Sequence, residues 1–244
     1  MLQHKHLLQV QRDLYDIPRG PDRFNAYIGK LKDPKTDDMA LPLGPMNPMG
    51  KDHIPELLDR YLALKADEVA QQIVDSLQSK KLFGSEAFQT ALVIADDAHG
   101  QWTNHIATDF NHRFDCRPMF RRGWLVGLLW TSETPSIDII EKTIREAIYR
   151  GVHIQKNGLP SNLGQLIKQE GFAQANAGGI NQFDDEELEY TQQLLEPLFT
   201  AEDEPTLIAA IYGDPAAHEL GHQPLGLSKN AGLELGLHLQ KISL

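Results

Sequence analysis

The stretch TALVIADD, residues 90–97, is an unbroken apolar run that ends in two aspartates. A continuous run of this length is typical of a strand buried on both faces, as strands are in parallel sheets. A second run of the same kind is WLVGLLW, residues 124–130. We therefore predict two buried strands at these positions.

Helical patterns surround the two runs. Residues 102–114 have a helical pattern, and Ile137, Ile140, Ile144 and Ile148 form one face of a helix that extends to about residue 155. Residues 90–155 thus predict the order β-α-β-α, with parallel strands and a right-handed crossover. Because two strands do not form a stable sheet alone, we expect a further strand, which the pattern does not locate.

The remaining periodic segments predict helices. They cover residues 7–15, 21–31, 54–80, 163–175, 184–199, 205–212, 215–221 and 231–239. The predicted fold class is α/β or α+β, dominated by helices, with a small, mostly parallel sheet and a helical C-terminal part. We predict a single domain, residues 1–244, in which residues 1–155 contain the β-α-β-α core and residues 156–244 form an acidic helical part.

The charge of the chain is uneven. The net charge is −11, and residues 169–228 hold 12 of the 34 acidic residues and none of the 23 basic residues. Because phosphate binding needs concentrated positive charge, this distribution predicts no nucleic-acid partner. Four arginines lie close together at Arg113, Arg117, Arg121 and Arg122. They would pair with the acidic stretch, either within the chain or across a homo-oligomer.

The cellular location is predicted from what the sequence lacks. Cys116 is the single cysteine, so no disulfide forms within the chain, as expected in a reducing cytoplasm. No apolar run is long enough to span a bilayer, and residues 1–13 do not have the pattern of a secretory signal. We therefore expect a cytoplasmic protein without a membrane partner.

Acidic side chains follow both predicted strands. Ligands of parallel α/β folds bind outside the carboxyl ends of the strands, where Asp96, Asp97 and Glu133 would gather as candidate catalytic residues. If the strand continued through the two aspartates, only one of them would face the pocket. Candidate binding residues at the same edge are Trp102, Thr103, Asn104 and Ser132, and Gly100 belongs to the same turn. The start of the following helix offers backbone N–H groups to an anion.

This edge predicts a small-molecule pocket, which binds or transforms its ligand. Carboxylates also bind hard cations, so a divalent cation such as magnesium is a candidate cofactor. The structural alternative is that Asp97 or Thr103 caps the helix, Trp102 belongs to the core and Glu133 is solvated. The reaction type does not follow from these residues.

A separate motif lies near the C-terminus. Residues 218–222 are His218-Glu219-Leu220-Gly221-His222, which matches the pattern H-E-x-x-H. In these five residues the chain resembles zinc peptidases. The resemblance implies that His218 and His222 bind zinc from one helix face and that Glu219 is the general base. A third ligand is required, and residues 231–239 offer Glu234 and His238, which lie four apart on one helix face.

Other features of this segment favour a purely structural helix. Pro215 and Pro224 bracket the motif, and Gly221 lies inside it, where glycine costs about 1 kcal/mol relative to alanine. The alternative is a short helix capped by Asp214. The sequence therefore leaves three hypotheses open: a small-molecule enzyme or binding protein, a zinc-dependent hydrolase or peptidase, and a non-catalytic oligomeric assembly protein.

Overall fold

A three-stranded parallel sheet forms the centre of the first part of the chain. Its strands are β1 (Leu2–Lys5), β2 (Phe88–Ala95) and β3 (Trp124–Trp130), in the order β1-β2-β3. The computed structural model describes residues 1–98 and 102–242. The chain divides into two units: residues 1–108 and 117–147 form unit 1, which contains the sheet, and residues 109–116 and 148–244 form unit 2. The predicted helix-dominated α/β class is confirmed.

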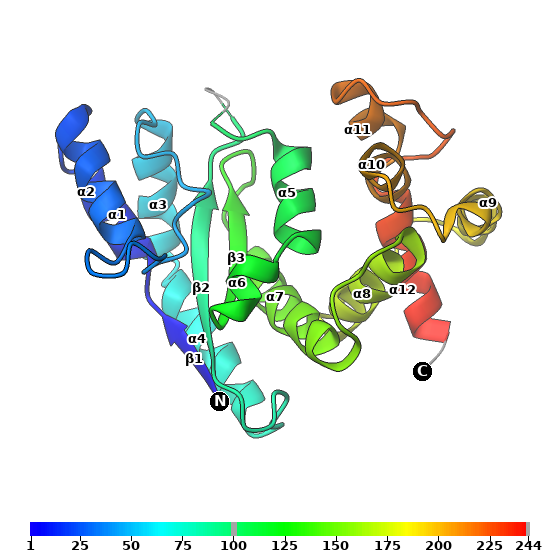
Figure 1. The fold of residues 1–244 in the computed structure, drawn as a ribbon, viewed down its shortest axis with the longest axis horizontal. Coiled ribbons are helices and arrows are strands. Elements are labelled where there is room, and N and C mark those ends of the chain that lie inside the picture. The colour runs from blue at the N-terminus through cyan, green and yellow to red at the C-terminus, as the bar shows by residue number, and fades with distance from the viewer. Residues whose placement is uncertain (99–101, 243–244) are drawn as a thin grey trace. The chain divides into compact units, whose positions relative to one another are not determined.

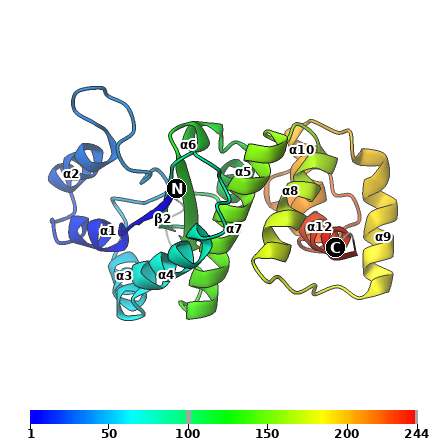
Figure 2. The ribbon, with the colours of Figure 1, turned by 90° about the horizontal axis from the view of Figure 1, so that it is seen from below.

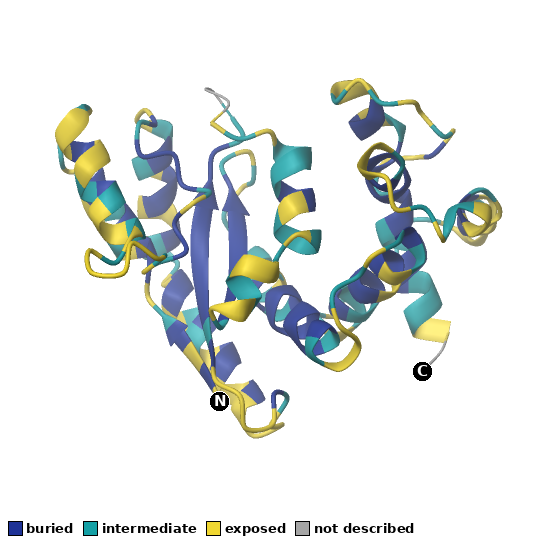
Figure 3. Ribbon diagram, in the orientation of Figure 1, coloured by how far each residue is buried: buried dark blue, intermediate teal, exposed yellow. Residues whose placement is uncertain are grey.

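The two central strands match the apolar runs. Figure 3 shows β2 and β3 buried along their length, as expected for strands covered on both faces. Ala95 pairs with Trp130, so β2 and β3 end at the same level. The residues that follow the two strands are therefore brought to one edge of the sheet.

The third strand is β1, which the sequence did not locate. Its inward residues are Leu2 and His4 rather than a run of apolar side chains. The His4 ring lies 2.9 Å from the Thr90 hydroxyl and 3.0 Å from the Asp67 carboxylate. Asp67 also accepts a hydrogen bond from the Leu8 backbone. Buried polar pairing therefore holds this strand against β2, and apolar periodicity does not reveal such pairing.

A side chain continues the sheet where β1 stops. The last residue of β1, Lys5, pairs with Ala91. Beyond that point the buried Gln11 donates a hydrogen bond to the Leu92 carbonyl and accepts one from the Ile94 N–H. The Gln11 amide thus pairs two backbone groups of β2 that a longer β1 would otherwise pair.

Helices cover the sheet in unit 1. They are α1 (Leu8–Leu14), α2 (Pro21–Leu31), α3 (His53–Ala63), α4 (Ala66–Gln78), the first turn of α5 (His105–Phe114), α6 (Arg117–Arg121) and the first half of α7 (Ile137–Asn157). The predicted helix over residues 54–80 is two helices, because Lys65 adopts a left-handed conformation with φ 54°. Figures 1 and 2 show α1 and α2 on one side of β2 and α7 on the other.

The proline-containing loop of residues 42–50 is part of the core rather than a solvated loop. Leu43, Met46 and Asn47 are buried. The Tyr27 hydroxyl donates a hydrogen bond to the Leu43 carbonyl, and the Tyr15 hydroxyl donates one to the Asn47 carbonyl. These tyrosines pair the backbone of a segment that has few N–H donors of its own, which allows the loop to be buried.

Unit 2 is a group of short helices. After the end of α7 it contains α8 (Leu163–Asn176), α9 (Asp185–Leu195), the short 3₁₀ helix Glu196–Leu198, α10 (Glu204–Tyr212), α11 (Asp214–Glu219) and α12 (Ala231–Ile242). Helices α8 and α12 cross at Gly171 and Gly236. A Cβ on Gly171 would lie 2.0 Å from the Gly236 carbonyl oxygen, so the two backbones touch only because both residues are glycine.

A buried ionic cluster also belongs to unit 2. The Glu170 carboxylate accepts hydrogen bonds from Arg150 at 2.6 Å and 2.9 Å and from Arg113 at 2.5 Å. Arg113 also pairs with Asp109, which accepts a hydrogen bond from the Tyr212 hydroxyl. One member of the arginine cluster therefore meets one residue of the acidic stretch within the chain.

None of the helices in residues 1–98 and 102–242 combines the length and the apolar character needed to cross a membrane.

Candidate functional site

Two aspartates occupy the carboxyl end of β2. The strand ends at Ala95, so the alternation expected for a continuing strand does not apply. The Thr131 hydroxyl, which follows β3, lies 3.1 Å from an Asp96 oxygen and 2.9 Å from an Asp97 oxygen. Both carboxylates therefore reach the same hydroxyl, and the condition under which only one of them would face the pocket, a strand that continues through both, is not met.

Asp96 is the inner member of the pair. Its side chain is fully buried, and the Asn47 amide donates a hydrogen bond to Oδ2 at 2.7 Å. The His53 Nε2 lies 3.0 Å from Oδ1. The buried loop and the start of α3 thus supply the partners of this carboxylate.

Asp97 is the outer member and holds a second histidine. Its side chain is 4% exposed and lies 2.6 Å from the His105 Nδ1. The Ser132 hydroxyl donates to the same oxygen at 2.6 Å, and the Ser132 N–H donates to the other oxygen at 2.9 Å. Burial by itself would raise the pKa of Asp97, but the hydrogen bonds from His105, Ser132 and Thr131 outweigh it and lower the pKa well below its ordinary value. An ionised carboxylate only accepts, so Nδ1 of His105 is the donor.

The His105 ring is oriented from two directions. Asp97 holds Nδ1, and the ring packs against the Trp130 ring with centroids 4.1 Å apart and an interplanar angle of 32°. The His105 side chain remains 40% exposed. The strand-end site thus contains an oriented imidazole that a molecule in solvent can reach. We use this term for Asp96, Asp97, Thr131, Ser132, Glu133, His53 and His105.

Glu133 is the third predicted acid and stands in a different environment. Its Oε2 accepts a hydrogen bond from the Trp130 N–H at 3.3 Å. Burial raises the pKa of Glu133 above its ordinary value, and the nearby charge of Asp97 acts in the same direction. The carboxyl groups of Asp97 and Glu133 therefore have pKa values shifted in opposite directions at one edge of the sheet.

Of the predicted binding residues, Thr103 and Asn104 bond to the backbone of the protein, whereas Trp102 is exposed. The Thr103 hydroxyl donates to the Asp96 carbonyl at 2.8 Å, and the Asn104 side-chain oxygen accepts from the Ala107 N–H at 2.9 Å, as an N-cap of α5 does. Trp102 is 44% exposed, so the alternative that places it in the core is wrong. Gly100 lies outside the described residues.

Among the described residues, the predicted metal positions lack a group of ligands. Within residues 1–98 and 102–242, no three His, Cys, Asp or Glu side chains are grouped so that they could hold a metal ion. Asp96 and Asp97 accept hydrogen bonds from protein groups on both oxygens. The predicted magnesium therefore has no ligand set in the described geometry.

The motif at residues 218–222 does not form one helix face. Helix α11 ends at Glu219, and Gly221 has φ 71°, which reverses the chain. The His222 N–H then bonds the Ala217 carbonyl at 2.7 Å, as in a helix C-terminal cap. His222 consequently lies beyond the helix that carries His218, and the premise of two zinc ligands on one helix face is wrong.

Glu234, the proposed third ligand of the zinc hypothesis, is engaged elsewhere, because its carboxylate accepts a hydrogen bond from the Gln182 N–H at 2.8 Å. The structural alternative made Asp214 the N-cap of this helix, and that is also wrong. Asp214 is the first residue of α11, and it accepts from the Leu225 and Gly226 N–H groups. In the described residues, His218, His222 and Glu234 do not form a ligand group.

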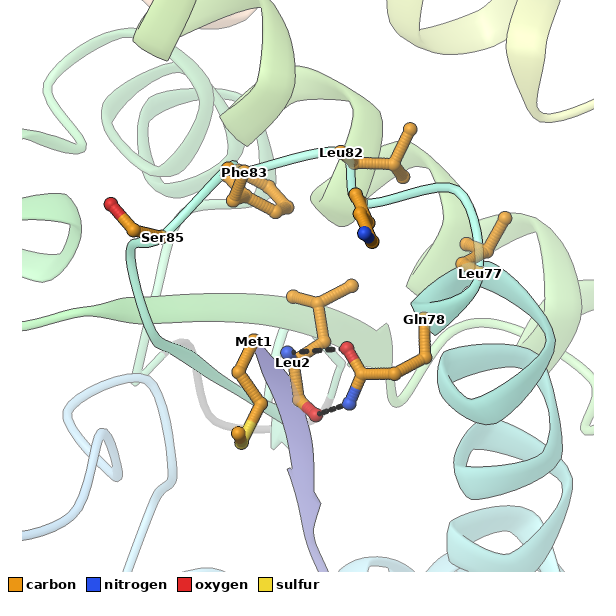
Figure 4. A pocket seen from close by; sticks show the side chains of 9 residues that line it. Met1, Leu2, Leu77, Gln78, Leu82, Phe83 and Ser85 are labelled. Atoms are coloured by element: carbon orange, nitrogen blue, oxygen red, sulfur yellow. Dashed lines mark hydrogen bonds between the residues drawn. The ribbon is translucent and has the colours of Figure 1, made fainter.

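A pocket opens at the opposite end of the sheet. It has a volume of about 570 Å³ and lies at the amino ends of β1 and β2 (Figure 4). Its wall is mainly apolar, and the Gln78 side chain there pairs with the Leu2 backbone at 2.8 Å and 2.6 Å. Its described lining residues include no histidine and no carboxylate, so it lacks the acid–base groups of the strand-end site.

Three residues of the strand-end site, Thr131, His53 and His105, were not among the predicted site residues. Thr131 follows Trp130, which pairs with Ala95, so the strand register would have placed it beside Asp96. His105 begins the helix that follows Asp97, and its distance from the strand end along the chain is short enough for this contact to have been considered. His53, and Asn47 beside it, come from a helix start and a loop far along the chain, and no local pattern connects them with the strand ends.

Comparison with known proteins assigns no family to the chain. A scan of protein-family models finds no match, and searches of curated proteins and of solved structures find none either.

Proposed function

We propose that the strand-end site is the active site of an enzyme that transfers a proton on a small molecule, with His105 as the general base. The observation that supports this most is the 2.6 Å contact between the Asp97 carboxylate and the His105 Nδ1. The contact lies at the carboxyl ends of parallel strands, where α/β proteins commonly bind ligands.

The hydrogen bond to Asp97 determines which nitrogen of the neutral His105 ring carries the proton. Because Nδ1 donates to Asp97, Nε2 is the proton-accepting atom of the neutral ring. Asp97 also stabilises the positive charge that the ring gains when it takes a proton, as the aspartate of a catalytic triad does. Asp97 is thus a positioning residue, and Thr131 and Ser132 hold it in place.

Glu133 is suited to the opposite role. A carboxyl group with a raised pKa is a better proton donor near neutral pH than an ordinary glutamate. We assign Glu133 the role of the acid that returns a proton.

The test is turnover of a filtered extract of small metabolites, followed by mass spectrometry. The wild-type protein should deplete at least one compound and form a product. His105→Gln should lower the rate at least ~100-fold, because general acid–base catalysis contributes about 10²–10⁴. The control is His6→Gln, which changes an exposed histidine of the same unit and should leave the rate unchanged.

A second measurement tests the geometry without any substrate. Long-range ¹H–¹⁵N spectra of neutral His105 should show the proton on Nδ1, and Asp97→Asn should weaken that preference. The proposal is wrong if no compound in the extract changes or if His105→Gln acts as fast as the wild type. A neutral His105 protonated mainly on Nε2 would also contradict it.

A further inference from the structure

The Thr131 hydroxyl contacts both aspartates of the strand-end site. Its oxygen lies 3.1 Å from an Asp96 carboxylate oxygen and 2.9 Å from an Asp97 carboxylate oxygen. It also accepts hydrogen bonds from the backbone N–H of Asp97 at 3.0 Å and from that of Ala98 at 3.1 Å. Two donors and two acceptors therefore surround one hydroxyl.

This hydroxyl cannot serve both carboxylates at once. It has a single proton and two lone pairs. The two backbone N–H groups can only donate, so they occupy both lone pairs, and one proton is left for two carboxylates. Thr131 therefore donates to either Asp96 or Asp97. Rotation about its Cβ–Oγ1 bond exchanges the two states, and no proton passes from one residue to another.

Each aspartate also contacts a histidine. The His53 Nε2 lies 3.0 Å from the same Asp96 oxygen that Thr131 reaches, and the His105 Nδ1 lies 2.6 Å from Asp97. The two carboxylates are 1% and 4% exposed, whereas the side chains of His53 and His105 are 21% and 40% exposed. A continuous row of contacts thus runs from one partly exposed ring through two buried carboxylates to the other ring. We call His53, Asp96, Thr131, Asp97 and His105 the histidine row.

The two carboxylates compete unequally for the Thr131 proton. Apart from Thr131, three groups of the described chain donate to Asp97 and two donate to Asp96. They are the Ser132 N–H, the Ser132 hydroxyl and His105 for Asp97, and the Asn47 amide and His53 for Asp96. Asp96 is also fully buried, and a buried charge is costly when its hydrogen bonds are not made. While His53 is neutral, the hydroxyl therefore favours Asp96.

A positive charge on His53 reverses this preference. When the ring takes a second proton from solvent, it compensates the charge of Asp96, and Thr131 then donates to Asp97. A carboxylate that receives an additional hydrogen bond stabilises a positive ring less, so His105 holds a proton less tightly in this state. Direct repulsion between two positive rings acts in the same direction. The two histidines consequently compete for one proton.

We propose that His53 is a positioning residue of the strand-end site, which acts through the histidine row to keep the His105 ring neutral. This inference rests on the proposed function, in which His105 is the general base. A general base must be unprotonated before it can accept a proton from a substrate. His53 takes up the resting proton of the site and leaves His105 in the form that accepts one.

Other titratable or charged groups of the described chain face the two histidines. They are Glu133 after β3, Tyr15 on α1 and the exposed chain neighbours of His53, which are Lys51, Asp52 and Glu56. These groups stay the same in every variant of the experiment below. They therefore do not account for differences between the variants.

The experiment follows the pH titration of the His105 ring by nuclear magnetic resonance in the unliganded full chain, with His105→Gln used to identify its signals. His53→Gln keeps a donor for Asp96 but cannot become charged. The control is His6→Gln, which removes an exposed histidine of the same unit. Both changes are made in the wild-type chain, in Thr131→Ser, which keeps the hydroxyl, and in Thr131→Val, which removes it.

The expected results distinguish the hydroxyl from direct repulsion. His53→Gln should raise the proton affinity of His105 at least ~2-fold, which is the lower range of what one net hydrogen bond contributes. His6→Gln should leave this affinity unchanged. The effect of His53→Gln should persist in Thr131→Ser. On a logarithmic scale it should fall by half or more in Thr131→Val, because only the repulsion between the rings then remains.

Two results would overturn the inference. One is a change in the His105 proton affinity below ~2-fold, or a decrease, in His53→Gln, and the other is an effect that stays above half its size in Thr131→Val. The comparison of His53→Gln with His6→Gln needs no change at Thr131, so it decides the inference even if Thr131→Val does not fold. The proposed function fails separately, because the titration is measured without substrate: rapid turnover by His105→Gln contradicts only that proposal.

Discussion

Replacing Glu170 by glutamine removes a buried negative charge from between two arginines, and we expect a loss of about 3 kcal/mol in the free energy of unfolding. Burial by itself would raise the pKa of Glu170, but the charges of Arg150 and Arg113 outweigh it and lower the pKa from 4.5 to about 2. At 1.36 kcal/mol per pKa unit, this difference corresponds to about 3 kcal/mol. Breaking a buried ion pair by removing one partner costs about 3–5 kcal/mol, which agrees.

The assay is urea unfolding at neutral pH, followed by far-ultraviolet circular dichroism. The control is Lys168→Gln, which also removes one charge from α8 but at an exposed position, and it should change stability by less than about 0.5 kcal/mol. A loss below about 1 kcal/mol in Glu170→Gln, or a loss equal to that of the control, would refute the reasoning.

Three further predictions concern stability. Because the pKa of Glu170 is lower in the folded protein, its contribution is present above pH 4.5 and is lost as the pH falls toward 2; the urea midpoint of the wild type should therefore drop over this range more steeply than that of Glu170→Gln. Gly171→Ala should cost about 3 kcal/mol or more, because its Cβ would lie 2.0 Å from the Gly236 carbonyl oxygen. By contrast, Gly29→Ala in α2 meets no atom within 4 Å and should add up to about 1 kcal/mol in the same unfolding assay. Gln11→Leu should cost about 2–4 kcal/mol, because it leaves a carbonyl and an N–H of β2 unpaired, and hydrogen exchange should be faster in β2 than in β3.

The parts of the fold that the sequence predicted correctly have strong apolar patterns, and a strand that it missed is held by polar contacts. The runs at residues 90–97 and 124–130 correspond to β2 and β3, because these strands are buried on both faces. β1 escaped detection because its pairing depends on His4, Thr90 and Asp67, which lie far apart in the chain. The break between α3 and α4 depends on a left-handed lysine, which sequence periodicity does not reveal.

The residues of the candidate site also divide into those that local sequence patterns predict and those that only long-range packing brings to the site. Parallel topology was enough to predict that Asp96, Asp97 and Ser132 would lie at one edge, and the structure brings them together. Asn47 and His53 reach this edge only through the packing of a buried loop and α3. The H-E-x-x-H pattern predicted a site that the structure does not contain in its described residues. A single glycine with positive φ, Gly221, separates the two histidines that the motif places on one helix face.

The course of the chain through unit 2 limits how the protein can be dissected. Residues 109–116 belong to unit 2, although residues 117–147 return to unit 1 before the rest of unit 2 begins. This short segment supplies Asp109 and Arg113, the partners of Tyr212 and Glu170. A fragment cut at residue 148 would keep Tyr212 and Glu170 but lose these two partners, so the helical unit cannot be produced intact as one uninterrupted piece of the polypeptide.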